Sequence, residues 1–438
     1  MGVDPDESYE TYNKSNCNHT IHIKLLKPKT IICPICGSVD NSKLVSSKSQ
    51  FIKYSSALEN NITIKLYRRV YRCSCGHYFK QDNPFAEEKR STSIQKDLNI
   101  LRQLKLINQT FSSVAKNNNV SVTYVTDVFD KKVDIRRLTL PHILCVDEVY
   151  AKRLSYHKYC FIAYDPRNRK IIDVLDSRHI DDTLNYFYAI PYEERKNVKF
   201  FSTDLYEPYR VLAQKCFPEA IICDDSFHVI KNISSFFHRI RIKVMKKYAH
   251  LKDNNDNYYW LFKSFFKLLT KDRSKLSYHK FNVKRSGQYM STMEIVDYML
   301  SIDNELKLAY ELLHEYRAFN EIATSLNARE WLDELIERFK CSGIEEYKPA
   351  WKLLVNWHDE IINSFTLDDG YRISNGPMER VNRDIKTIFR NAYGSTNFIR
   401  MRNRIMYVLN DDSPILYNRK RNTNKLVGKP RGIYRKHK

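Results

Sequence analysis

Four apolar residues, Ile143 to Val146, lead directly into Asp147 in the segment ILCVDEVY. A continuous apolar run of this kind is typical of a strand that is covered on both faces. Burying a carboxylate in such a place costs free energy unless a positive charge compensates it. The segment therefore predicts a buried strand over 143–150 with a cation, most simply a divalent metal ion, beside Asp147.

The residues that follow have the alternation of an α/β fold. Three antiparallel strands followed by alternating helix and strand is the order of a ribonuclease H-like sheet. The first and fourth strands of such a sheet are neighbours, so Asp204, which follows the fourth strand, would lie beside Asp147. The pattern predicts strands at 143–150, 158–165, 170–176, 198–203 and 220–223, and helices at 180–188, 207–217 and 226–248.

A third acid, Glu379, follows an Asn-Gly-Pro turn and lies in the first turn of a predicted helix. From a helix packed on the sheet it can reach the same place as the two aspartates. Three carboxylates are hard oxygen ligands of the kind that hold two Mg²⁺ (or Mn²⁺) ions for phosphoryl transfer. The alternative for each acid alone is an ordinary paired or strand-end residue. Three basic residues of the same helix are predicted to contact DNA: Arg380, Arg383 and Lys386.

The charge balance indicates a polyanionic partner. Lys and Arg number 73 against 51 Asp and Glu, which gives a net charge of +22. The alternatives are a solvated surface and membrane-surface binding, but a surplus of this size in an otherwise ordinary chain favours nucleic acid. The N-terminus lacks the apolar stretch of a secretory signal, and no apolar run approaches the roughly 20 residues of a membrane span. We expect a cytoplasmic, nucleoid-associated protein whose cysteines are thiols.

Two cysteine pairs predict a structural zinc site. Cys33 and Cys36 are followed by Gly, and Cys73 and Cys75 recur about 35 residues later beside a second Gly. Pairs of this kind on hairpins supply the four ligands of a tetrahedral zinc ion. The second pair is one residue short, so His77 could replace a thiol; the further alternative is free cysteines. A basic strand beside this site suits phosphate contact through Arg68, Arg69 and Arg72.

Residues 91–138 have the outline of a helix-turn-helix. Apolar residues recur at three- and four-residue spacing from Ile94 to Ile107, and a polar turn then precedes a second helix that begins at Ser121. That helix would offer Ser121, Thr123 and Tyr124 to a DNA groove. Two ordinary packed helices are the alternative on spacing alone.

The sequence thus predicts an α/β multidomain protein. An all-helical insertion interrupts the catalytic core, and its aromatic residues around Trp260 are expected to form helical core instead of a surface that stacks on bases. The predicted order is an irregular arm (1–30), a zinc ribbon (31–90), the helix-turn-helix domain (91–138), the first part of the ribonuclease H-like core (139–249), the insertion (250–345), the final core helices with Glu379 (346–410) and a basic tail (411–438).

The order of these motifs resembles the transposases of the ISL3 family of insertion sequences, over residues 31 to 410. The motifs are CPICG, RRVYRCSCG, the helix-turn-helix, VDE, STD, DDSFHVIKN and SNGPMERVNRDIKTIFRNAYGSTNFIRMRNRI. The resemblance implies a DDE enzyme with a ribonuclease H-like core and the catalytic triad Asp147, Asp204 and Glu379. It also implies that His228, in the motif with Asp225, positions the site or contacts the scissile phosphate; helix packing is the alternative.

These features predict a DNA transposase that recognises terminal inverted repeats, cleaves each end and transfers the freed 3′-hydroxyl to target DNA. Pairing two ends implies a homodimer or a larger assembly on double-stranded DNA. The competing hypotheses are an inactive or domesticated transposase that acts as a DNA-binding protein, and a ribonuclease H-like nuclease without strand transfer.

Overall fold

The structure is a computed structural model. It describes residues 5–13, 18–57, 60–87, 90–152, 158–251, 258–283, 288–392, 396–413 and 415. The chain divides into two compact units, which are described separately below. The terminal unit comprises Met1–Arg136 and Thr387–Lys438, and the central unit comprises Arg137–Lys386. Most of the predicted basic tail lies outside the described residues.

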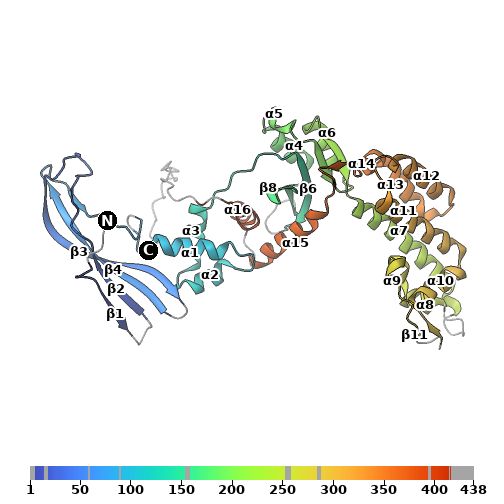
Figure 1. Ribbon diagram of the computed structural model, residues 1–438, viewed down its shortest axis with the longest axis horizontal. Coiled ribbons are helices and arrows are strands. Elements are labelled where there is room, and N and C mark those ends of the chain that lie inside the picture. Colours follow the sequence, from blue (N-terminus) through green and yellow to red (C-terminus); the bar gives the residue numbers. More distant parts are fainter. Residues whose placement is uncertain are drawn as a thin grey trace, which may run out of the picture. The chain divides into compact units, whose positions relative to one another are not determined.

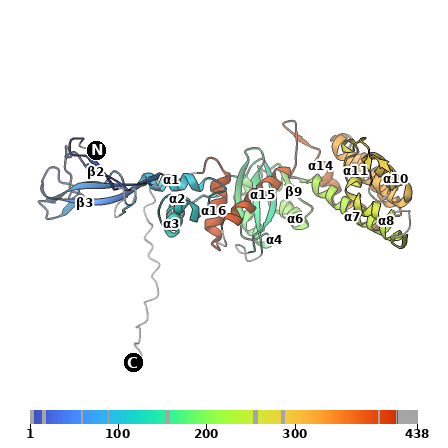
Figure 2. The ribbon, with the colours of Figure 1, turned by 90° about the horizontal axis from the view of Figure 1, so that it is seen from below.

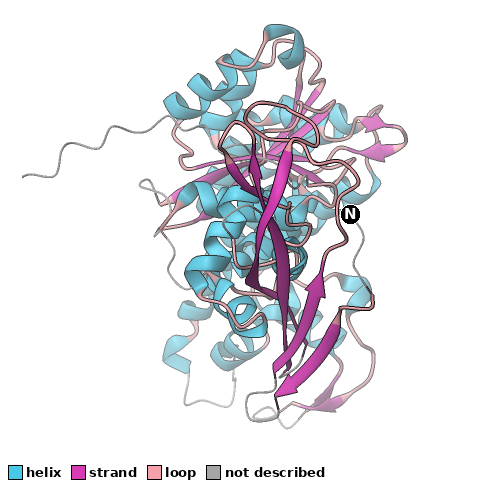
Figure 3. Cartoon of the chain, turned by 90° about the vertical axis from the view of Figure 1, so that its left-hand side faces the viewer, coloured by secondary structure: helices cyan, strands magenta, loops and turns pink. Residues whose placement is uncertain are grey.

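A five-stranded sheet forms the first part of the terminal unit. The strands are β1 (Tyr9–Asn13), β2 (Asn18–Lys24), β3 (Ser42–Ala57), β4 (Asn60–Cys73) and β5 (Tyr78–Lys80). Their order is β1-β2-β4-β3, and β5 also pairs with β4. The two longest strands, β3 and β4, make a twisted antiparallel pair (Figure 3), whereas β2 runs parallel to β4.

This sheet corrects the prediction of an irregular arm at 1–30. β2 pairs with β4 along its whole length, from Asn18↔Asn61 to Lys24↔Tyr67. Ile23 is buried in one cluster with Ile52 and Leu66 of the long strands. The partner of β2 lies about forty residues away in the chain, and a local pattern cannot reveal such a pairing. The segment predicted as a separate zinc ribbon therefore shares its sheet with the N-terminal residues.

The predicted helices of the terminal unit form as α1 (Ile94–Leu104), α2 (Phe111–Asn117) and α3 (Val122–Lys132). Each begins at a hydroxyl residue whose oxygen accepts a backbone N–H three residues later: Ser93, Thr110 and Ser121. The predicted Ser121 cap is thus confirmed.

A fourth helix, α16 (Phe398–Leu409), completes the terminal unit. The ring of Tyr407 packs edge-on against Phe129 of α3, and its hydroxyl donates to the carbonyl of Leu101 in α1. We predicted that 346–410 forms the last helices of the catalytic core; the structure instead groups α16 with α1–α3. The buried polar residues of α16, which bind carbonyls of that helical group, explain the difference.

The central unit contains a five-stranded sheet of order β10-β9-β6-β7-β8 (Figure 1). β6 is antiparallel to β7 and parallel to β9, so the first and fourth strands are neighbours as predicted. The strands are β6 (Ile143–Tyr150), β7 (Tyr159–Asp165), β8 (Lys170–Leu175), β9 (Phe200–Thr203) and β10 (Ile221–Asp224). These bounds agree with the predicted strands within two residues.

Helices cover the sheet of the central unit. Leu144 and Val146 of β6 are buried in one cluster with Phe187 and Leu212, which come from two of these helices. The helices after the sheet's strands are α4 (Ile180–Tyr188), α5 (Tyr192–Arg195), α6 (Glu207–Cys216) and α7 (Ser226–Lys247). The helix with the predicted Glu379, α15 (Gly376–Asn391), lies beside the sheet in both Figure 1 and Figure 2.

The predicted insertion is mainly helical. Of the aromatic residues expected in its core, Phe262 is buried and Phe265 is partly buried there. Trp260 is only half-buried. One antiparallel pair of two-residue strands, β11 (Phe281–Asn282) and β12 (Tyr289–Met290), departs from the all-helical prediction. The helices are α8 (Tyr258–Ser264), α9 (Phe266–Leu269), α10 (Thr292–Ile302), α11 (Asn304–Ile322) and α12 (Ala328–Cys341), followed by α13 (Lys348–Asn356), α14 (His358–Asn363) and the short pair β13 (Leu367–Asp368) and β14 (Tyr371–Arg372).

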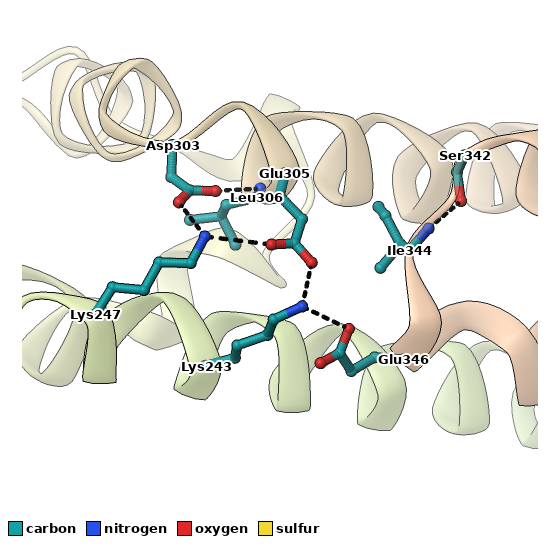
Figure 4. A network of polar contacts seen from close by, with 8 residues as sticks. All are labelled: Lys243, Lys247, Asp303, Glu305, Leu306, Ser342, Ile344 and Glu346. Carbon is teal, nitrogen blue, oxygen red and sulfur yellow. Dashed lines mark hydrogen bonds and ion pairs between the residues drawn. The ribbon is translucent and has the colours of Figure 1, made fainter.

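Ion pairs join this helical region to α7 (Figure 4). Lys247 contacts Asp303 at 2.9 Å, and Lys243 contacts Glu305 at 2.6 Å. Asp303 also caps α11, because its carboxylate accepts the N–H of Leu306 at 3.0 Å. The start of α11 is therefore fixed against the last turns of α7.

Candidate active site

The register of the central sheet brings two predicted acids together. β6 and β9 are parallel, with Cys145 opposite Ser202, an offset of 57 residues. Asp147 and Asp204 are separated by the same 57 residues in the sequence, so both lie at the same level on adjacent chain segments. Each of them, and also Glu148, has a carboxylate oxygen within 4.8 Å of the others.

Burial makes the charged form of both aspartates costly. Loss of hydration raises the pKa of Asp147 to about 7, and repulsion by the charge of Asp204 acts in the same direction. Loss of hydration and the nearby charge of Glu148 raise the pKa of Asp204 to about 6. One oxygen of Asp204, Oδ1, is buried without a hydrogen-bond partner among the described residues. A cation at this point would satisfy that oxygen and compensate both charges, so the site fits a divalent metal ion.

The start of α15 is anchored beside Asp147. The amide of Asn382 donates to Asp147 Oδ2 at 2.5 Å, and the backbone N–H of Glu148 donates to Oδ1 at 2.7 Å. The amide of Asn375, just before the helix, donates to the carbonyl of Val146 at 3.2 Å. Asn382 was not among the predicted site residues. Its signal was a polar residue among the apolar positions that α15 buries, next to Val381.

Glu379 lies in the first turn of α15, as predicted, but its side chain is exposed. It precedes Asn382 by three residues, about one helical turn. Among the described residues, the carboxylates that cluster are Asp147, Glu148 and Asp204, and Glu379 is not one of them. The structure therefore brings two of the three predicted acids together and places the third one turn from the residue that contacts Asp147.

Glu148 is a member of the cluster that the sequence analysis missed, although it directly follows Asp147. Its carboxylate accepts hydrogen bonds from Arg178 at 2.5 Å and from the hydroxyl of Tyr209 at 2.9 Å. The guanidinium of Arg178 also stacks on the ring of Tyr159, 4.0 Å from its centre. Glu148 is thus paired with a fixed cation, in contrast to Asp147 and Asp204.

His228 lies within the electrostatic influence of the same two aspartates, Asp147 and Asp204. It lies in the first turn of α7, where Asp225 caps the helix and contacts the Nδ1 atom of His228 at 3.1 Å. This hydrogen bond raises the pKa of His228, and the charges of Asp204 and Asp147 raise it further. The structure therefore places His228 in contact with Asp225 and under the influence of both aspartates, and its predicted role at the site stays a prediction.

The four predicted cysteines also lie together, in the terminal unit. The Sγ atoms of Cys33 and Cys75 are 3.8 Å apart, and those of Cys36 and Cys73 are 3.6 Å apart. A tetrahedral zinc ion with Zn–S bonds of about 2.3 Å requires sulfurs about 3.8 Å apart. The cluster therefore fits zinc, and it includes Cys75 in place of the alternative ligand His77.

Glycines make the two turns around these cysteines possible. Gly37 and Gly76 have φ angles of +70° and +88°, a region that other residues rarely adopt. At the second turn, the N–H of Gly76 donates to the carbonyl of Cys73 at 2.9 Å, and this hydrogen bond closes a tight turn around Cys75. This tight turn is how Cys75 reaches the cluster with only one intervening residue.

Comparison with protein families gives a match to a transposase family of the ISL3 DDE type over residues 144–405, more than half of the chain. The chain belongs to the ISL3 family of DDE transposases. The matched span runs from β6 into α16 and includes Asp147, Asp204, His228 and Glu379. A comparison with curated proteins gives no match.

The predicted DNA-contact residues of this transposase differ in how the structure uses them. Arg68 donates to the carbonyl of Gln81 at 2.6 Å, and Arg69 donates to the carbonyl of Leu25. Both guanidinium groups thus hold the terminal sheet together. Arg72 is exposed, with its guanidinium 5.4 Å from the ring centre of Tyr78.

On α3 of the transposase, Ser121 and Thr123 are exposed. Tyr124 is half-buried and donates its hydroxyl to Asp97 of α1 at 2.5 Å. The hydroxyl that we predicted to face a groove is therefore engaged inside the fold.

On α15, the three predicted basic residues Arg380, Arg383 and Lys386 are all exposed.

Among the helices that the structure describes, none combines the length and the apolar character that a membrane span needs.

Proposed function

We propose that this transposase binds the terminal inverted repeats of its element, cleaves DNA at each end and joins the freed 3′-hydroxyl to target DNA, with two Mg²⁺ (or Mn²⁺) ions. The observation that carries the proposal is the pair Asp147 and Asp204, which share one level of the sheet and both have a raised pKa. A buried pair of carboxylates with an unsatisfied oxygen is a cation-binding arrangement.

In this proposal Asp147, Asp204 and Glu379 hold the metal ions. When bound, such ions activate the attacking oxygen and stabilise charge on the leaving oxygen. Glu379 is preferred to Glu148 as the third ligand because Arg178 already neutralises Glu148. Glu379 is exposed and lies one turn before Asn382, the residue that contacts Asp147.

The other residues orient these ligands and the DNA. Asn382 and the N–H of Glu148 each bind one oxygen of Asp147 and so fix the plane of its carboxylate. Asp225 engages Nδ1 of His228, which leaves Nε2 as the nitrogen that donates to a phosphate oxygen of the scissile bond. The raised pKa of His228 favours the charged form that such a contact needs.

In the terminal unit, we propose that the zinc ribbon and the helix-turn-helix recognise the repeats. Zinc held by Cys33, Cys36, Cys73 and Cys75 is structural in this proposal, because four protein ligands leave no open position. Cleavage at two ends further implies a homodimer or a larger assembly on double-stranded DNA.

The test is an assay with labelled DNA ends taken from the flanks of the gene, a plasmid target, and Mg²⁺ or Mn²⁺. The wild-type protein should give joined products. Asp147→Asn, Asp204→Asn and Glu379→Gln should each lower their yield by at least roughly 100-fold, the scale for losing a group that stabilises developing charge. The exposed helix residue Asp181 supplies the matched control, since Asp181→Asn removes one carboxylate of the same unit and should leave the yield unchanged.

The competing functions give different products. Nicked ends without joined products would identify a nuclease that lacks strand transfer. Binding to the ends without cleavage by the wild-type protein, under both metals, would identify a DNA-binding protein. An active Glu379→Gln variant alongside an inactive Glu148→Gln variant would reassign the third metal ligand to Glu148.

A further inference from the structure

A polar cavity of about 310 Å³ lies in the terminal unit, between the long strand pair and the start of the helices. This volume far exceeds the roughly 10–15 Å³ that one water molecule needs on the same measure. The lining includes Lys53 of β3, Lys96 of α1 and three asparagines, Asn18, Asn61 and Asn119. None of the described residues that line the cavity is acidic.

The two lysines are brought to this cavity by a rigid junction. The N–H of Lys53 donates to the carbonyl of Ser91 at 2.8 Å, and the N–H of Ser93 donates to the carbonyl of Lys53 at 3.0 Å. Ser93 is also the cap of α1, where its side chain accepts the N–H of Lys96. The position of Lys96 relative to Lys53 is thus set by the backbone hydrogen bonds that Lys53 makes with Ser91 and with the cap residue Ser93.

The location of Lys96 is costly for a cation in three ways. Only 3% of the residue is exposed. It lies in the first turn of α1, where the helix dipole presents positive charge. The charge of Lys53 is close by, and burial together with that charge lowers the pKa of Lys96 to about 8. An anion in the cavity would offset all three costs.

Amide groups complete the lining. Asn119 lies in the turn between α2 and α3 with a φ angle of +50°, and its amide donates to the side-chain oxygen of Asn61 at 3.1 Å. Asn61 pairs in register with Asn18 across β4 and β2. Asparagine amides supply neutral N–H donors, which together with two ammonium groups match the oxygens of a phosphate group.

We propose that this cavity is a phosphate-binding site, in which Lys53 and Lys96 supply the charge and the asparagine amides supply further donors. The phosphate is either a phosphodiester of bound DNA or free phosphate. Only the first source rests on the proposed function. As a DNA site, the cavity would fix the turn between α2 and α3 at one backbone position of the duplex.

The first experiment measures thermal unfolding of the full-length protein with and without inorganic phosphate, at constant ionic strength set with chloride. Phosphate should raise the melting temperature of the wild-type protein. Lys53→Gln and Lys96→Met should abolish this shift. Lys116→Gln should retain it, because Lys116 is an exposed lysine of α2 that does not line the cavity.

The second experiment measures the affinity for a short duplex as a function of salt. If the site holds a DNA phosphate, Lys53→Gln and Lys96→Met should each bind more weakly, and the slope of log K against log salt should shrink by about one. If only the inorganic phosphate shift is lost, the site belongs to free phosphate.

The proposal is overturned if neither ligand distinguishes the cavity variants from the wild type, or if Lys116→Gln loses the inorganic phosphate shift as they do. Neither readout uses cleavage. The catalytically impaired Asp147→Asn should therefore bind phosphate normally, so failure of the catalytic proposal and failure of this one are separate results.

Discussion

At the scale of single residues, the carboxylates of the central sheet differ in what surrounds them. Glu148 has a guanidinium and a phenol hydroxyl as partners, whereas Asp204 keeps a buried oxygen with no partner among the described residues. The same end of strands β6 and β9 thus contains an acid that is paired with a cation and an acid that is not. The uncompensated acids are the ones that a cation would stabilise, and this difference has measurable consequences for stability.

The first prediction concerns pH. Both aspartates have a folded-state pKa above the unfolded value of about 3.9. Their neutral forms therefore contribute stability that is complete below that value and is lost as pH rises through about 6 for Asp204 and about 7 for Asp147. Without added divalent metal, hydrogen exchange of peptides from β6 and β9 should become faster, relative to intrinsic rates, between pH 5 and pH 8, values chosen to bracket these pKa values.

The double substitution Asp147→Asn with Asp204→Asn should remove this pH dependence. At the alkaline end, it should stabilise the sheet against opening by on the order of a few kcal/mol, since one pKa unit is about 1.4 kcal/mol. Asp181→Asn should follow the wild type at every pH. A wild-type profile that is flat over this range would show that the two carboxyls are not held uncompensated.

The second prediction concerns Asn382. Its amide fixes one oxygen of Asp147, so Asn382→Ala should lower strand transfer by roughly 10–100-fold, the usual cost of losing a group that orients a metal ligand. Higher Mn²⁺ should restore part of the activity if the defect lies in metal binding. Arg383→Gln, the next residue on the exposed face, should change DNA affinity without this metal dependence. Equal metal dependence in both variants would remove the orienting role.

At the scale of elements, the strands and helices around the acids were predictable because local patterns determine them. The strand at 143–150 and the helix at 180–188 form over the predicted residues. The neighbouring strands could be inferred from their order, and the common separation of 57 residues then aligns Asp147 with Asp204. In this part of the chain, local pattern and strand order together contain most of the geometry.

Three other features depend on contacts between distant segments and have no local signal. β2 pairs with β4 over a long sequence separation. α16 binds a carbonyl of the segment that follows α1, almost three hundred residues earlier. In the sequence alone, Asn382 cannot be distinguished from any other polar residue of a helix, because its partner Asp147 is identified only by the fold. Hydrogen bonds of this kind can be satisfied by many partners, and only the packed structure selects one.

The third prediction concerns the cysteine cluster at the end of the β3–β4 pair where Ser42 lies opposite Cys73. The purified protein should contain one zinc ion per chain, and Cys75→Ser should lose it while His77→Ala retains it, because Cys75 and not His77 lies in the cluster. Elemental analysis measures the metal directly. The converse result, with zinc lost from His77→Ala and kept in Cys75→Ser, would favour the alternative ligand.

Removing zinc should also loosen the adjacent ends of β3 and β4. Without the metal, four sulfurs in van der Waals contact lose their common ligand, and structural zinc sites contribute folding free energy directly. Hydrogen exchange should therefore increase around Ser42 and Cys73, which pair in register, and much less around Ile52 and Ile64 in the buried cluster. Uniform change along the whole strand pair would contradict a local role of the metal.

At the scale of the whole molecule, the chain leaves the terminal unit after Arg136 and returns to it at Thr387. The returning helix α16 is bound by several polar contacts. Arg404, which is 4% exposed, donates to the carbonyls of Leu106 and Gln109 at 3.1 and 3.0 Å. In the other direction, Lys105 donates to the carbonyls of Tyr407 and Asn410, both at 2.6 Å. The Arg404 contacts hold the segment between α1 and α2, and the Lys105 contacts satisfy carbonyls at the end of α16.

The last prediction follows from these contacts of α16. A chain that stops after residue 396 lacks α16, and a chain that stops after residue 415 lacks only residues beyond the described structure. The shorter chain should lose the fold of α1–α3, because each buried polar group left without a partner costs about 1–3 kcal/mol. Limited proteolysis with mass spectrometry should find cleavage within 91–135 in the shorter chain and protection in the longer one. Peptides of β6 and β9 should be protected equally in both, since their sheet lies in the other unit. Equal protection of 91–135 in the two chains would mean that the N-terminal helices fold without α16, and the unit would then end at Arg136.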